Sequence, residues 1–197
     1  MKKIKILVDN GHNKSTIGKQ SPDGRLKEWY ETRIIAKMLV EKLTDAGIDS
    51  VQLFPNEEDG NLVERTKIIN KIVDENIKNG IECLLISIHI NAAGNGVWHN
   101  ARGVSVWVSN NASNASKEFA QLFFKQVENN GLKGNRCVPK EKFCTSNFYI
   151  LKNTKCPAVL TENLFQDNKE DVEYLLSDEG KEKIVDCHYK AIMEYIN

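Results

Sequence analysis

Short apolar runs alternate along this chain with longer stretches in which apolar residues recur with helical periodicity. The runs are typical of buried strands, and they lie at residues 4–8, 51–54, 84–88, 103–109, 148–151 and 157–161. Between them, apolar residues recur three or four positions apart, which predicts amphipathic helices. These helices begin near residues 29, 62, 113 and 168, and one more ends the chain. Alternating strands and helices are typical of an α/β sheet domain.

The run Leu84–Ile88 shows little polar alternation, as in a strand that is covered on both faces in the middle of a parallel sheet. Residues 131–147 are polar and irregular, so no clear crossover helix precedes residue 148. We therefore predict an α/β fold, a single domain over residues 1–197 whose mostly parallel sheet has helices on both faces. A mixed sheet remains the open alternative.

The composition argues against a nucleic-acid-binding protein and against a membrane-spanning one. The chain has 197 residues, of which 41% are hydrophobic, and its 27 basic residues balance 27 acidic ones. This balance differs from the basic patch of a nucleic-acid-binding protein. No apolar run approaches the roughly 18 residues of a membrane span. The apolar run Ile6–Val8 is also far shorter than the core of a signal peptide, so we expect a protein made in the cytoplasm without one.

Cysteine usage argues against a disulfide framework and against a structural zinc knuckle. The five cysteines are an odd number and form no C-x-x-C pair. We expect reduced, mostly buried thiols, with a bridge between Cys137 and Cys144 left open.

Four polar residues are expected at one edge of the sheet. His12 follows the first strand, His89 ends the central strand, and Glu162 follows the strand that ends at Thr161. Glu31 lies in the first turn of the helix after the first strand, with Glu28 as a rival. Because ligands bind at the carboxyl ends of strands in open α/β sheets, these side chains are predicted to be neighbours.

Two imidazoles and one carboxylate form a recognised catalytic zinc set, with a fourth position open for water. A second carboxylate that is not a ligand can then act as general base. Each residue also has an ordinary interpretation: a turn histidine for His12, a first-turn acid for Glu31, and a salt bridge for Glu162. His188, on the apolar face of the last helix, is expected in the core, and His99 in an exposed loop.

Five motifs occur in one order along nearly the whole chain. They are V-D-N-G-H (8–12), Y-E (30–31), L-V-E-R-T (62–66), S-I-H-I-N-A (87–92) and P-A-V-L-T-E-N-L-F-Q-D-N (157–168). Together they resemble the zinc-dependent N-acetylmuramoyl-L-alanine amidases of the third amidase family, which includes cell-wall hydrolases and phage endolysins. The resemblance implies one α/β domain around a twisted, mostly parallel sheet.

By position, the resemblance implies that His12, Glu31 and His89 bind Zn²⁺ and that Glu162 is the catalytic glutamate. It implies a structural role for Arg65, in an ion pair on its helix. The expected reaction is hydrolysis of the amide between the lactyl group of N-acetylmuramic acid and L-alanine of the stem peptide.

The chain departs from the family pattern at Asn10, Asn13 and Leu164, which leaves the finer substrate preference open. We expect peptidoglycan as the partner, without membrane insertion, and action on the cell wall after release or export. We expect no cell-wall-binding module. The alternatives are a zinc peptidase or deacylase that acts on another amide, and a non-catalytic peptidoglycan-binding domain.

Overall fold

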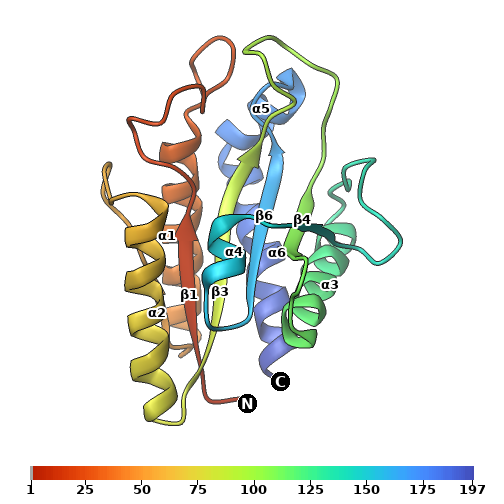
Figure 1. The fold of residues 1–197 in the computed structure, drawn as a ribbon. Coiled ribbons are helices and arrows are strands. Elements are labelled where there is room, and N and C mark those ends of the chain that lie inside the picture. Colours follow the sequence, from red (N-terminus) through yellow and green to blue (C-terminus); the bar gives the residue numbers. More distant parts are fainter. Residues whose placement is uncertain (1) are drawn as a thin grey trace.

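The apolar runs of the sequence become the strands of one six-stranded sheet (Figure 1). The computed structural model describes residues 2–197. The strands are β1 (Ile4–Asn10), β2 (Ser50–Gln52), β3 (Glu82–Asn91), β4 (Ser105–Ser109), β5 (Cys144–Ser146) and β6 (Ala158–Phe165). The helices are α1 (Glu28–Asp45), α2 (Leu62–Lys78), α3 (Asn114–Asn129), α4 (Tyr149–Asn153), α5 (Lys169–Leu176) and α6 (Asp178–Ile196).

The strand order is β2-β1-β3-β6-β4-β5. Strands β2, β1, β3 and β6 are parallel, whereas β4 is antiparallel to β6 and parallel to β5. The predicted α/β domain with a mostly parallel sheet is therefore confirmed, and the sheet is of the mixed kind. The connection from β3 to β4 contains no helix, which is why β4 does not join the parallel set.

Helices cover both faces of the sheet, so the central strands are buried on both sides. Ile6 and Ile86 point into the core beneath α1, α3 and α6, while Leu7 and Leu85 point into a second core beneath α2 and α4. Figure 1 shows α4 in front of the sheet and α6 behind it. This double burial explains why β3 reads as a continuous apolar run rather than an alternating one.

Two segments differ from the sequence prediction. Residues 148–151, predicted as a strand, belong to the short helix α4, and the segment predicted to be irregular contains β5. A short apolar run does not distinguish a strand from a buried helical turn. In α4 the carbonyl groups of Tyr149 and Ile150 accept hydrogen bonds from Asn153 and Thr154, at 2.8 and 2.6 Å, which stabilises the helical turn.

The sheet register brings three of the predicted site residues to one edge. Asn10, at the end of β1, pairs with Ile88, and His89 pairs with Glu162. His12 follows β1 by two residues, and the first turn of α1 returns to the same edge. Across residues 2–197, none of the helices is both long enough and apolar enough to cross a membrane.

Candidate metal centre

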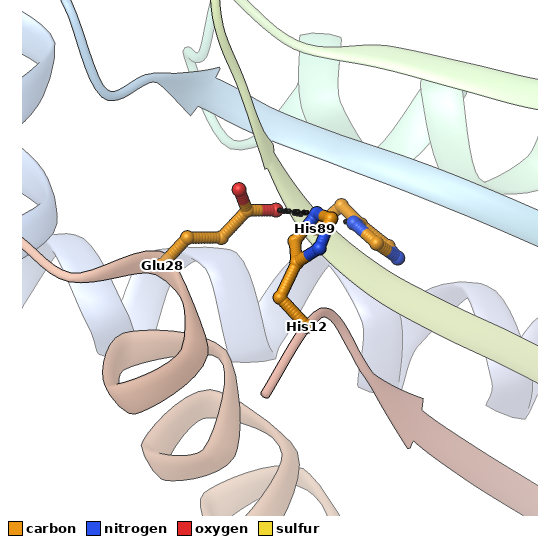
Figure 2. A group of neighbouring side chains, drawn as sticks. All are labelled: His12, Glu28 and His89. Atoms are coloured by element: carbon orange, nitrogen blue, oxygen red, sulfur yellow. Dashed lines mark hydrogen bonds and ion pairs between the residues drawn. The ribbon is translucent and has the colours of Figure 1, made fainter. Parts of the chain in front are cut away.

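His12, Glu28 and His89 form a compact group at the carboxyl edge of the sheet (Figure 2). The Glu28 Oε1 atom lies 3.1 Å from His89 Nδ1 and 3.4 Å from His12 Nε2. The two imidazole rings are nearly perpendicular, with centroids 4.9 Å apart. One ligand atom from each residue lies within 4.8 Å of the others, which is close enough for one shared cation.

Tight backbone turns hold the two imidazoles this close. His12 has a positive φ of 60°, an unusual conformation for a residue with a side chain. A Cβ atom at Gly11 would lie 2.6 Å from His89 Nδ1, so only glycine fits at that position. Arg33 donates a hydrogen bond of 2.9 Å to the His12 carbonyl, and Thr32 donates one of 3.2 Å to the Gly11 carbonyl. Helix α1 therefore fixes the turn that carries His12.

The structure places Glu28, the rival named from the sequence, in this group and not Glu31, the predicted ligand. Glu31 is buried against α6, and its carboxylate lies 3.2 Å from the Lys181 ammonium. Three residues along a helix correspond to about 4.5 Å of rise and about 60° of rotation, which is enough to separate the two glutamates. Glu28 is the first residue of α1 and lies nearest the sheet edge. A sequence pattern locates a helix start only to within one or two residues, so it could not tell which of the two glutamates begins the helix.

Glu162 lies beside His89 on the neighbouring strand, as the predicted convergence required. Its Oε2 atom is buried and forms no hydrogen bond within the described residues. The same is true of Glu28 Oε2. Buried carboxylate oxygens without partners are costly. The two imidazoles and the Glu28 carboxylate are a donor set that suits a cation such as Zn²⁺.

Burial and close charges shift the pKa values of all four groups. Burial lowers the pKa of His12 to about 4 and raises that of Glu162 to about 7. Burial opposes charge on His89 and on Glu28 as well, but their mutual hydrogen bond and attraction outweigh it. The pKa of His89 therefore lies above its usual value and that of Glu28 below it. Such shifts are typical of functional sites.

A buried ion pair supports the strand end beneath the site. Arg65 of α2 pairs with Asp9 of β1 and donates a hydrogen bond of 2.5 Å to the Asn10 carbonyl. Its guanidinium also lies 4.4 Å from the centroid of the Phe54 ring. The structural role expected for Arg65 agrees with these contacts, but its partner is on a strand and not on its own helix.

The site opens into a pocket of about 490 Å³. One wall is apolar and includes Leu62, Phe148, Tyr149, Ile150 and Leu160. A polar part of the lining comes from the loop after β1, with Asn13, Thr16 and Lys19. A pocket of this size suits a small-molecule or peptide-sized ligand.

The remaining histidines and the cysteines lie outside the site. His188 is fully buried, as predicted, and its ring bonds to Thr161 and to the Ile184 carbonyl. His99 bonds to the Gly94 carbonyl at 2.8 Å and so stabilises its own loop. All five cysteines are free, and only Cys83 and Cys187 are fully buried.

Known proteins share both sequence and fold with this chain. A family model described as N-acetylmuramoyl-L-alanine amidase (Amidase_3) matches residues 6–194. An endolysin of Bacillus phage SPP1 is 32% identical over 115 residues, which are 58% of this chain and 40% of the endolysin. An uncharacterized protein of Clostridium perfringens is 29% identical over 194 residues, 98% of this chain and 52% of that protein.

Among solved structures, an N-acetylmuramoyl-L-alanine amidase from Clostridium difficile 630 has the same fold. Its TM-score is 0.81 at 23% identity, and the match covers 99% of this chain and 97% of that one. This chain spans about half or less of the length of the curated relatives it matches. The family model nevertheless covers nearly all of it, so the chain belongs to the N-acetylmuramoyl-L-alanine amidase family.

Proposed function

We propose that His12, Glu28 and His89 bind a Zn²⁺ ion. Imidazole nitrogen and carboxylate oxygen are suitable zinc donors, and three protein ligands leave one position open. The spacing of the three ligand atoms and the unpartnered Glu28 Oε2 support this assignment. When bound, Zn²⁺ would supply Lewis acidity and make water a better nucleophile near neutral pH.

We propose further that this chain hydrolyses the amide between the lactyl group of N-acetylmuramic acid and L-alanine in peptidoglycan. Glu162 accepts the proton of the attacking water and then donates it to the departing alanine nitrogen. The products are a free lactyl carboxylate on the sugar and a stem peptide with a free N-terminal L-alanine.

One observation carries this proposal: a buried, unpartnered carboxylate faces a two-histidine, one-carboxylate group at a pocket in a chain of this family. Glu162 lines the pocket, so a substrate bound there would have its amide close to the carboxylate that activates the water. We propose that the enzyme acts on the cell wall, where this substrate lies.

Digestion of purified peptidoglycan with the zinc-loaded protein tests the function. We expect new L-alanine N-termini that do not form in the presence of a chelator and return when zinc is restored. Glu162→Gln should slow their release by about 10²–10⁴-fold, the usual contribution of general acid–base catalysis, without loss of zinc. Cleavage only within the stem peptide would instead identify a peptidase. Binding of peptidoglycan without cleavage, by a protein that holds no zinc, would identify a binding domain.

A further inference from the structure

The pocket contains one cationic side chain that forms no ion pair within the described residues. Its lysine and arginine residues are Lys19 and Arg65. Arg65 pairs with Asp9, whereas no carboxylate among residues 2–197 lies within ion-pair distance of Lys19, although its charge acts on Glu28 and Glu162. Lys19 is half-buried, so its ammonium can reach an anion bound in the pocket.

The backbone holds Lys19 in place although its side chain is free. The Glu28 N–H donates a hydrogen bond of 3.0 Å to the Lys19 carbonyl, which ties the residue to the start of α1. On either side, Gln20 forms a β-bridge with Lys27, and Gln166 donates a hydrogen bond of 3.1 Å to the Gly18 carbonyl. The loop therefore presents Lys19 at a defined place on the pocket wall.

The two walls of the pocket suit different halves of a muramyl peptide. Two residues of the apolar wall, Tyr149 and Ile150, belong to α4, which packs against α2, β4 and β6, and the ring centroids of Phe148 and Trp107 lie 5.5 Å apart. Lys19 lies in the loop after β1, which is separated from β6 by β3, the strand that carries His89. Aromatic walls suit the apolar face of a sugar ring.

Charge decides which half of the substrate meets Lys19. The sugar half of a muramyl peptide carries no charge, since its lactyl carboxyl is used in the amide bond. The carboxylates lie on the peptide half. A charge-assisted hydrogen bond from the Lys19 ammonium to such a carboxylate would favour the acid over the uncharged amide.

We propose that Lys19 binds a carboxylate of the stem peptide and makes the enzyme selective for stem peptides with free acids over amidated ones. This inference rests on the proposed amidase function and deepens it. Lys19 is thus a specificity-determining residue on the peptide side of the scissile amide. It takes no part in the proton transfers of Glu162.

Two substrates and three variants test the inference. The substrates are a muramyl dipeptide whose second residue has free carboxylates and the same compound with those groups as carboxamides. We expect Lys19→Gln to raise KM for the acid about tenfold, with kcat and zinc content unchanged, and to leave the amide substrate unaffected. Lys19→Arg should keep KM within about threefold of wild type. Lys14→Gln is the matched control, because Lys14 is in the same loop but pairs with Glu57.

Added salt should weaken the preference for the acid in the wild type, because a partly exposed charge pair is screened. An equal rise in KM for both compounds, or a fall in kcat without a change in KM, would overturn the inference. If the wild type cleaves neither compound, the proposed function fails. The inference is then judged by calorimetric binding to Glu162→Gln: tighter binding of the acid that depends on Lys19 supports it, and equal Kd values refute it.

Discussion

Glu28 is the residue on which the geometry of the metal group depends. Its Oε1 atom accepts a hydrogen bond of 3.0 Å from the Ile90 N–H and lies close to both imidazoles, while Oε2 is buried and free. One oxygen thus fixes the side chain and the other can meet a cation. Glu31, one turn along the same helix, is engaged by Lys181 and supports helix packing instead.

Exchange of single glutamates for glutamine separates these two roles. Glu28→Gln should weaken zinc binding by at least about 100-fold, more than is usual for residues that only orient ligands. Glu31→Gln should leave zinc affinity within about threefold of wild type, because its carboxylate does not reach the metal group. Competition titration against a zinc-sensitive dye measures both affinities. If Glu31→Gln weakened zinc binding strongly and Glu28→Gln did not, Glu31 would be the ligand instead.

The buried Arg65–Asp9 pair gives a second prediction at this scale. The two side chains are only 4% and 2% exposed. Removal of one partner leaves an uncompensated buried charge, so Arg65→Met should lower the free energy of unfolding by about 3–5 kcal/mol. Urea denaturation of the metal-free protein measures this loss.

Lys155→Gln is the control for Arg65→Met, because it breaks the exposed pair with Asp74 and should cost about 1 kcal/mol at most. Equal losses for the two variants would show that burial of the Arg65 pair contributes nothing to stability.

At the scale of elements, the helix ends decide which loops frame the pocket. Helix α2 begins with a capping box, in which Asn61 accepts from the Glu64 N–H and Glu64 accepts from the Asn61 N–H, at 3.1 and 2.9 Å. Asn61 and Leu62 also line the pocket. The capping residue that begins α2 therefore also forms part of the pocket lining.

Loss of this cap should have a measurable cost. Asn61→Ala leaves helix N–H groups without an acceptor and should lower the free energy of unfolding by about 1 kcal/mol. Thermal and urea unfolding monitored by circular dichroism would detect it. Asn110→Ala, at an exposed turn, should change stability by less than about 0.5 kcal/mol. No difference between the two variants would argue against the cap.

At the scale of the whole molecule, His188 links the last helix to the sheet. Thr161 Oγ1 lies 3.0 Å from its Nε2 atom, and Asn163 of the same strand donates hydrogen bonds to Thr161 and to the His89 carbonyl. In the neutral tautomer with the proton on Nδ1, Nδ1 donates to the Ile184 carbonyl and Nε2 accepts from the Thr161 hydroxyl. Burial lowers the pKa of His188 to about 4.

This shift makes stability depend on pH. The unfolded chain binds a proton at His188 below pH about 6.5 while the folded protein does not, so stability present above that pH is lost as the pH falls toward 4. Between pH 7.5 and 5 the loss from His188 should be about 2 kcal/mol. His188→Gln should remove that part of the slope.

Both proteins are compared without metal, so that the contributions of the site histidines are the same in each. Parallel curves of unfolding free energy against pH would contradict the role of His188.

The sequence by itself determined the α/β class, the strands β1, β3 and β6, the buried position of His188, and the order in which His12, His89 and Glu162 reach the sheet edge. These follow from hydrophobic periodicity and from the rule that parallel strands end at one edge. Only the tertiary structure showed that Glu28 rather than Glu31 lies beside His12 and His89, that residues 149–153 form a helix, and that Lys19 lines the pocket. Each of these depends on contacts between distant segments, and a local pattern carries no information about which distant group lies nearby.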